Sequence, residues 1–299
     1  MLGVVAVFVF LLLRLAPGDP AAILAGDAAT ADNIAAIRAS LGLDQPLPVQ
    51  FGIWLGHLLT GDLGQSFYYR TSVTTLIGQR LEPTLALAAL TLLLSVAVAV
   101  PLGVLAAWRH GGWLDRALMA FSVAGFSIPV FVVAYLLIWL VSLKLGWLPV
   151  QGYSRLSQGF IPFVKHLILP SITLSFIYIA LIARVTRASV LEALGEDYIR
   201  TARAKGLPEA RVLVRHALAN AAVPIATVVG IGIAILVGGV VVTESVYAIP
   251  GLGRLTVDAV LARDFPTVQG VILFFSFVYV MVNLLVDLSY AFLDPRIRY

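Results

Sequence analysis

The chain has 299 residues, of which 60% are hydrophobic and only 12% are charged, and its mean hydropathy is +0.98. Soluble domains are about 45–50% apolar and about 25% charged, so the composition excludes an ordinary soluble protein and indicates a membrane protein. The net charge is +4 and cysteine is absent. Disulfide frameworks, cysteine-containing metal sites and thiol catalysis are therefore excluded.

The first apolar run, Met1–Leu13, is short, and Arg14 follows it. Two interpretations compete: a transmembrane helix (residues 1–15) whose N-terminal part is absent from this chain, or the apolar region of a cleaved signal peptide. No basic residue precedes the run and no small-x-small cleavage site follows it. These features favour the incomplete helix.

Residues 16–81 are expected to form an external segment with its own short amphipathic helices. The first helix is predicted between the capping candidate Thr30 and a glycine stop at Gly42. Its apolar face consists of Ile34, Ile37 and Leu41. A second amphipathic stretch, expected at the membrane interface, carries Phe51, Trp54, Leu55, Leu58 and Leu59.

Five later stretches contain no charged residue, and each is long enough to cross a bilayer as a helix, which takes roughly 17–25 residues. They are Pro83–Trp108, Ala117–Leu143, His166–Ala183, Ala217–Thr243 and Phe265–Val286. The sequence thus predicts an all-α membrane protein of six transmembrane helices, the first one incomplete. Five of these helices form a core over residues 82–293.

The basic residues indicate the orientation of these helices. Eleven of the 20 Lys and Arg residues fall within 48 positions, in residues 108–116, 184–216 and 294–299. Because cytoplasmic loops are enriched in Lys and Arg, both termini are expected in the cytoplasm, with residues 294–299 as a cytoplasmic tail. Topology accounts for the positive charge, so no nucleic-acid partner is expected.

Proline and small residues within the spans bear on helix packing. Pro101 and Pro129 each remove a backbone hydrogen bond and bend their helices unless neighbours compensate. Small residues recur at every fourth position in two spans: Ser95, Ala99 and Gly103, and Gly230, Ala234 and Gly238. Such faces permit close helix approach, at a dimer contact or along a pathway, although lipid-facing filler is the alternative.

Catalytic and nucleotide-binding motifs are missing from the sequence. There is no G-x-x-x-x-G-K-[ST], G-x-S-x-G or H-E-x-x-H, and the four histidines stand apart, at positions 57, 110, 166 and 216. None of the five full spans carries the intramembrane charge usual in ion-coupled carriers. The chain is therefore expected to be non-catalytic, to bind no cofactor or metal, and to draw energy from other subunits.

The inner segment 184–216 contains a well-marked short helix. Glu196 and Asp197 suit its N-terminus, Arg203 and Lys205 suit its C-terminus, and Gly206 is the expected stop. Pro208 is placed to begin the next helix at its first position. An apolar face is predicted on the first helix from Tyr198, Ile199 and Ala202.

Residues 192–208, with 215–224 after them, resemble the cytoplasmic coupling loop of ABC-importer permeases of the dipeptide, oligopeptide and nickel group. Arg200, Thr201 and Ala202 occupy the positions of the E-A-A motif of the broader superfamily, and Gly206 matches its glycine. The likeness extends through further blocks, which are Arg14–Pro20, Leu41–Pro46, Gly61–Phe67, Thr243–Gly253 and Asp294–Tyr299. The short N-terminus departs from the family, whose members begin with a basic stretch and a complete first helix.

The resemblance implies a permease subunit in the cytoplasmic membrane of a bacterium or archaeon. It would pair with a second, homologous permease in contact with membrane lipid. Two ATP-binding-cassette ATPase subunits would bind ATP and Mg²⁺, and an external solute-binding protein would deliver peptides. A nickel-chelate or glutathione importer is the close alternative, and an ion-coupled carrier or channel is the more distant one.

The resemblance also implies two sets of functional residues. The coupling helix that contacts the ATPase would comprise Asp197, Tyr198, Ile199, Arg200, Thr201, Ala202, Arg203, Lys205 and Gly206. The external mouth of the path would include Glu244, Pro250, Gly251 and Gly253. Glu244 would either form hydrogen bonds across the subunit interface or cap a helix, and the second interpretation is favoured.

Overall fold

The computed structural model describes residues 2–15, 20–25, 30–40 and 42–293, which form helices joined by turns, with no β-strand among these residues. The chain divides into two compact units: Met1–Leu81 with Leu255–Phe277 (unit 1), and Glu82–Arg254 with Val278–Tyr299 (unit 2). Three earlier expectations concern residues outside this description: Leu41, residues 16–19 of the Arg14–Pro20 block, and the tail 294–299. The domain limits expected from the sequence stay a prediction.

Unit 1 contains the short helices at the start of the chain. They are α1 (Leu2–Leu15), α2 (Pro20–Ala25), α3 (Ala31–Ser40) and α4 (Leu47–Leu59). Thr30 and Gly42 flank α3 as predicted, and Gly42 has a positive φ of 63°. The ring of Phe10 in α1 lies 5.1 Å from that of Phe51 and 5.6 Å from that of Trp54. Part of the apolar face of α4 therefore packs on α1.

A buried carboxylate holds a loop of unit 1 in place. Asp264 is fully buried just before α15 (Phe265–Leu293). It accepts hydrogen bonds from the Ser66 hydroxyl at 2.5 Å and from the Phe67 amide at 2.9 Å. The Thr267 hydroxyl donates a third at 2.7 Å. The loop around Ser66 is thereby fixed to the start of α15 by a fully paired charge.

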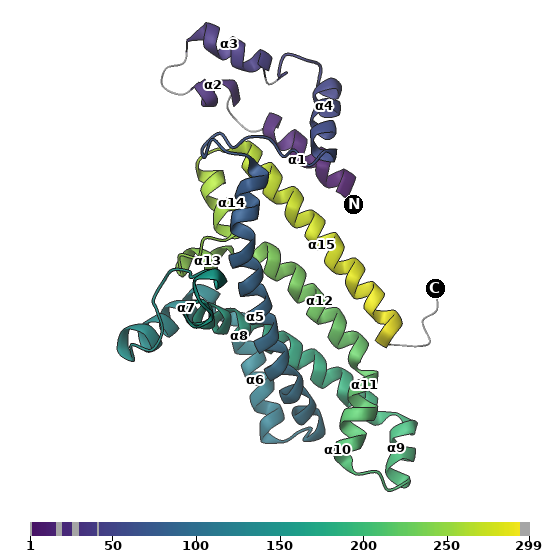
Figure 1. Ribbon diagram of the computed structural model, residues 1–299. Helices are drawn as coiled ribbons and strands as arrows, with labels where there is room; N and C mark the ends of the chain where they lie inside the picture. The colour runs from purple at the N-terminus through teal and green to yellow at the C-terminus, as the bar shows by residue number, and fades with distance from the viewer. Residues whose placement is uncertain (1, 16–19, 26–29, 41, 294–299) are drawn as a thin grey trace. The chain divides into compact units, whose positions relative to one another are not determined.

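Unit 2 contains most of the longer helices (Figure 1). Three helices, α5 (Val73–Trp108), α14 (Leu252–Leu261) and α15, run through both units. The others, with two π-helical segments and a 3₁₀ turn, are α6 (Trp113–Ser127), α7 (Val130–Leu137), η2 (Ile138–Lys144), η3 (Leu156–Gln158), α8 (Phe160–Gly195), α9 (Asp197–Ala204), α10 (Glu209–Arg211), η4 (Val212–Ala217), α11 (Leu218–Asn220), α12 (Ala222–Gly239) and α13 (Val241–Val246).

Three of the described helices are long and apolar enough to cross a membrane by length and composition: α5, α8 and α15. Two bent pairs raise this number to five if each pair is one span. The first pair, Trp113–Ser127 with Val130–Lys144, bends by 101°, and the second, Glu209–Asn220 with Ala222–Leu236, bends by 60°. An all-α membrane protein is confirmed, whereas the count of six crossings stays a prediction.

The prolines differ in their effect on the helices. Pro129 directly precedes α7 and lies at the 101° bend, as expected from the hydrogen bond that proline cannot donate. In contrast, α5 continues as one helix through both Pro83 and Pro101. The neighbours of a membrane helix can compensate for the missing bond, and helix packing decides whether a proline breaks the helix.

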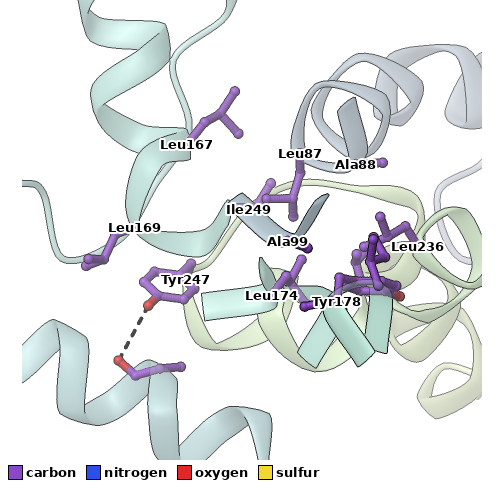
Figure 2. Packing of buried hydrophobic residues seen from close by; sticks show 14 of the residues in the cluster. Leu87, Ala88, Ala99, Leu167, Leu169, Leu174, Tyr178, Leu236, Tyr247 and Ile249 are labelled. Atoms are coloured by element: carbon purple, nitrogen blue, oxygen red, sulfur yellow. Dashed lines mark hydrogen bonds between the residues drawn. The ribbon is translucent and has the colours of Figure 1, made fainter. Parts of the chain in front are cut away.

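The core of unit 2 joins α5, α8, α12 and the turn after α13. Figure 2 shows Leu87 and Ala99 of α5 with Leu174 and Tyr178 of α8, and it shows Tyr247 with one hydrogen bond of its hydroxyl drawn dashed. That hydroxyl bonds the Thr173 hydroxyl at 2.8 Å. A buried tyrosine needs such a partner, which ties the turn after α13 to α8.

The small residues predicted to allow close approach do so within the chain. A Cβ added to Gly103 of α5 would meet the Ala183 carbonyl oxygen at 2.7 Å and the Thr186 Cβ at 2.7 Å, both on α8. A Cβ at Gly230 of α12 would overlap the Val286 side chain of α15. At these two positions, therefore, the small residue serves helix packing inside unit 2.

We predict that Gly103→Ala lowers the thermal unfolding midpoint of the detergent-purified protein. The added methyl group has no free space against α8, and overpacking of this kind costs about 1–3 kcal/mol. Gly78→Ala, on the same helix, is the matched control because its Cβ would meet nothing within 4 Å. Alanine favours a helix by about 0.5–1 kcal/mol relative to glycine, so the control should melt at an equal or higher temperature. Equal midpoints for the two variants would contradict the close α5–α8 contact.

Candidate functional site

The predicted coupling helix is α9, which spans Asp197–Ala204 between α8 and the short α10. Glu196 is its N-cap and Lys205 its C-cap, so its boundaries agree with the positions expected from the charges. Pro208 is the N-cap of α10, one residue before the position predicted for it. Figure 1 shows α9 and α10 as two short helices side by side.

One side of α9 is seated in a small apolar cluster. Ile199 is fully buried, and Ala202 is only 6% exposed. The cluster joins them to the ends of α5 and α8 and to η4, through residues that include Val104, Val190 and Val212. Because the cluster includes all four elements, a displacement of α9 requires either the loss of this packing or a common movement of these helices.

Tyr198 does not belong to this buried side. Its side chain is 39% exposed, so its place in the predicted apolar face is wrong. Ile199 and Ala202 are three residues apart and share one stripe of the short helix, whereas Tyr198 is turned about 100° away from Ile199. Polar and small residues fill the rest of the exposed surface of α9, which includes Arg200, Thr201 and Arg203.

The C-terminus of α9 ends in a glycine-dependent cap. Gly206 has a φ of 76°, its amide donates to the Arg203 carbonyl at 2.9 Å, and the Leu207 amide donates to the Ala202 carbonyl at 3.3 Å. This pair of bonds is the Schellman motif, which needs a left-handed residue and usually glycine. Leu207 completes it by packing on the apolar cluster. The glycine stop predicted from the sequence is confirmed.

Two ion pairs lie on the exposed side of this segment. Arg203 binds Glu209 of α10 through two nitrogens, at 2.8 and 3.2 Å. Arg200 pairs more loosely with Asp197 at 3.3 Å, within α9 itself. The paired charges of Arg203 and Glu209 join α9 to α10 across the turn, and Arg200 and Lys205 remain at the surface.

A buried ion pair that the sequence did not indicate lies at the same end of the bundle. Asp115 of α6 is 4% exposed and pairs with Arg187 of α8, whose Nη2 lies 2.8 Å from its Oδ2. The Gly111 amide donates to the same carboxylate at 2.9 Å, and His110 Nδ1 lies 3.2 Å from it. Arg187 therefore fixes α8 to the α5–α6 turn, beyond the membrane-surface role expected for it.

The second predicted set of residues surrounds Glu244 of α13, which is fully buried. Its Oε1 accepts the Thr84 hydroxyl at 2.7 Å, and its Oε2 accepts the Arg254 amide at 2.9 Å. Thr84 in turn accepts the Leu252 amide at 2.8 Å. The first amides of a helix have no partner within it, so Thr84 and Glu244 together cap α14. The favoured helix-cap interpretation of Glu244 is confirmed.

The glycines beside Glu244 are needed for its position. A Cβ at Gly251 would overlap the Glu244 carboxylate itself, and a Cβ at Gly253 would lie 2.9 Å from Cα of Val241. Pro250 lies partly buried in the same turn. The structure thus brings together the four residues predicted for the external mouth, and their location at that mouth stays a prediction.

A tyrosine outside the helices contacts the start of α5 near this cluster in the sequence. The Tyr153 hydroxyl donates to Glu82 at 3.1 Å, and the Leu156 amide donates to the same oxygen at 3.1 Å. Burial, and then the charge of Glu82, raise the pKa of Tyr153 well above its ordinary value. Tyr153 therefore stays a neutral hydrogen-bond donor that fixes the loop before α8 to α5.

Comparison with known proteins places this geometry in context. The family described as "Binding-protein-dependent transport system inner membrane component" matches residues 99–299, and the N-terminal family of such membrane components matches residues 1–88. A probable peptide ABC transporter permease of Sinorhizobium fredii is 55% identical over all of this chain and 96% of its own length. The glutathione transport system permease GsiC of Salmonella typhi is 44% identical over 99% of this chain and 94% of its own.

A solved structure has the same fold. The inward-facing MetNI methionine ABC transporter includes a chain that matches 73% of this chain and 96% of its own length, with a TM-score of 0.61. The sequences of the two chains are only 19% identical, so this likeness extends to the fold alone.

We predict that Gly251→Ala destabilises the protein, because the new methyl group displaces the Glu244 carboxylate from the start of α14. Leaving a buried carboxylate and a helix amide without their bonds costs about 1–3 kcal/mol or more. The measurement is the thermal unfolding midpoint in detergent, with Gly195→Ala as control, since a Cβ there has open space. A Gly251→Ala midpoint equal to that of the control would show that the carboxylate does not need this glycine.

Proposed function

Since the chain belongs to the family of binding-protein-dependent transport system inner membrane components, we propose that it is the permease subunit of an ABC importer for peptides. The observation that carries the proposal is the 55% identity, over the whole chain, to a protein described as a probable peptide ABC transporter permease. The structure adds an all-helical membrane fold with a short, firmly capped helix at one end of its core.

The proposed partners follow from what this chain contributes. A second, homologous permease would complete the translocation path, two ATP-binding-cassette ATPases would bind ATP and Mg²⁺, and an external binding protein would deliver the solute. The chain itself would have no enzymatic activity and would bind no cofactor. The absence of a P-loop from its sequence supports this division of labour.

The coupling step is proposed to act through α9. An ATPase that docks on the exposed side, at Arg200, Arg203 and Lys205, would push a helix whose other side is seated under α8 and η4. The buried Ile199 and the Arg203–Glu209 pair make α9 and α10 one rigid element. Rigid elements transmit a displacement without absorbing it, so closure of the ATPases would move α8 directly.

Glutathione is a second candidate solute. The glutathione permease GsiC aligns with nearly all of this chain at 44% identity. Glutathione is itself a small peptide, so the two candidates share a chemical class, and the external binding protein would distinguish them. A nickel chelate, or an ion-coupled carrier that works without ATPases, remains the alternative that transport measurements would detect.

The function is tested by reconstituting the chain with its partner permease, ATPases and binding protein in liposomes. We expect ATP-dependent, concentrative uptake of a labelled dipeptide, weaker or no uptake of labelled glutathione, and no uptake by this chain alone. An ATPase without its catalytic glutamate is the control that should abolish transport. Uptake driven by this chain alone, or uptake of a nickel chelate instead of peptides, would contradict the proposal.

Coupling is tested by substitution at Gly206. A valine there is expected to leave membrane insertion and ATP hydrolysis intact while uptake falls about five- to thirtyfold, because a left-handed residue other than glycine costs about 1–2 kcal/mol and shifts α9. A Cβ at Gly206 would meet nothing within 4 Å, so the loss would come from backbone strain and not from a clash.

Two controls accompany this variant. Gly206→Asn should retain more uptake, because asparagine tolerates the left-handed conformation, and Gly195→Ala should transport normally. Normal uptake by Gly206→Val would remove the coupling role from this turn.

A further inference from the structure

An open apolar groove of about 310 Å³ lies on unit 2 between α5, α6 and α8. Its walls include Val98 and Leu102 of α5, Trp113, Ala117 and Phe121 of α6, and Phe176 of α8. Almost no polar atom faces this space. A water-soluble solute would therefore find no hydrogen-bond partner there, whereas a hydrocarbon chain would lose nothing on entering it.

The groove lies toward the end of the bundle that carries α9. Val104 and Ala107, on the same stretch of α5, pack in one cluster with Ile199 and Ala202 of α9. Trp113 at the start of α6 is 75% exposed although it lines the groove. Tryptophan in such a position is typical of the boundary between lipid chains and headgroups.

A basic residue stands at this end of the groove. Arg109 follows Val98 and Leu102 by 11 and 7 residues, which places it on the same face of α5, and its amide still donates to the Leu105 carbonyl at 3.0 Å. Its guanidinium lies 5.3 Å from the centre of the Trp108 ring. No carboxylate among the described residues pairs with it, and the nearby Asp115 is engaged by Arg187 and His110.

From this arrangement we propose that the groove binds one acyl chain of an anionic phospholipid whose phosphate is held by Arg109. The chain length of the groove supplies apolar contact, and the cation supplies the preference for negative charge. Basic residues at the ends of grooves between transmembrane helices bind anionic headgroups in this way. The site would place a lipid against α8, the helix that continues into the α9 turn, and it does not depend on the identity of the transported solute.

The site is tested by native mass spectrometry of the full chain in detergent, titrated with phosphatidylglycerol or with phosphatidylcholine of the same acyl chains. We expect the first phosphatidylglycerol to bind about fivefold more tightly, as one cationic contact would give. Arg109→Gln should remove that preference. Arg116→Gln, an exposed arginine of α6 outside the groove lining, should retain it.

A second pair of variants tests the groove itself. Ala117→Phe fills the space and should weaken binding of both lipids, whereas Ala120→Phe, an exposed position of α6 that does not line the groove, should weaken neither. Inorganic phosphate should not compete, because the acyl chain provides most of the contact. Equal binding of the two lipids, equal effects of the paired variants, or a lipid-free dimer that Ala117→Phe dissociates would overturn the proposal.

Discussion

Close packing against α8 is the constraint on which unit 2 depends. This helix contacts α6, α7, α12, η4 and α9, and its neighbours approach it through residues too small to hold it at a distance. Gly103 of α5 meets the backbone of α8, and Gly125 of α6 leaves room for little more than the Ala180 methyl group. Lipid provides little hydrophobic drive for helices to associate, so contact of this closeness contributes much of the association energy.

Polar groups complete what packing begins, and each is fully engaged. Arg187 and Asp115 fix α8 to the turn between α5 and α6, and Glu244 with Thr84 fixes the start of α14. Removing one partner would leave a charge without compensation in a medium of low polarity. These contacts therefore act as positional constraints: they allow one arrangement of the helices and penalise its neighbours.

The sequence predicted the elements better than their contacts. Charge-free runs located the long helices, and the acid, base and glycine around α9 located its two ends, because these signals are local. The apolar face of α9 was predicted one residue too wide, since Tyr198 is exposed. The 101° bend at Pro129 was indicated only as a possibility, while Pro101 was tolerated, because neighbouring helices decide between the two outcomes.

Contacts between distant positions had no local signal at all. Asp115 and Arg187 are 72 residues apart, and Thr84 and Glu244 are 160 apart. In the sequence Arg187 is one of several basic residues near a membrane surface, and nothing near it identifies its partner. Only the fold brings these groups together. The cap of α14 was nevertheless anticipated in kind, because a lone acid beside a glycine-rich turn commonly binds helix amides.

The tight fit between Gly251 and Glu244 has an evolutionary consequence. The side chain of one residue occupies the volume that the other leaves empty, so neither position can drift alone. A shorter acid at 244 would vacate that volume, and only then would alanine at 251 become acceptable. Related permeases that have lost this glycine should therefore carry a compensating exchange at the position of the glutamate, as a second-site suppressor would in the laboratory.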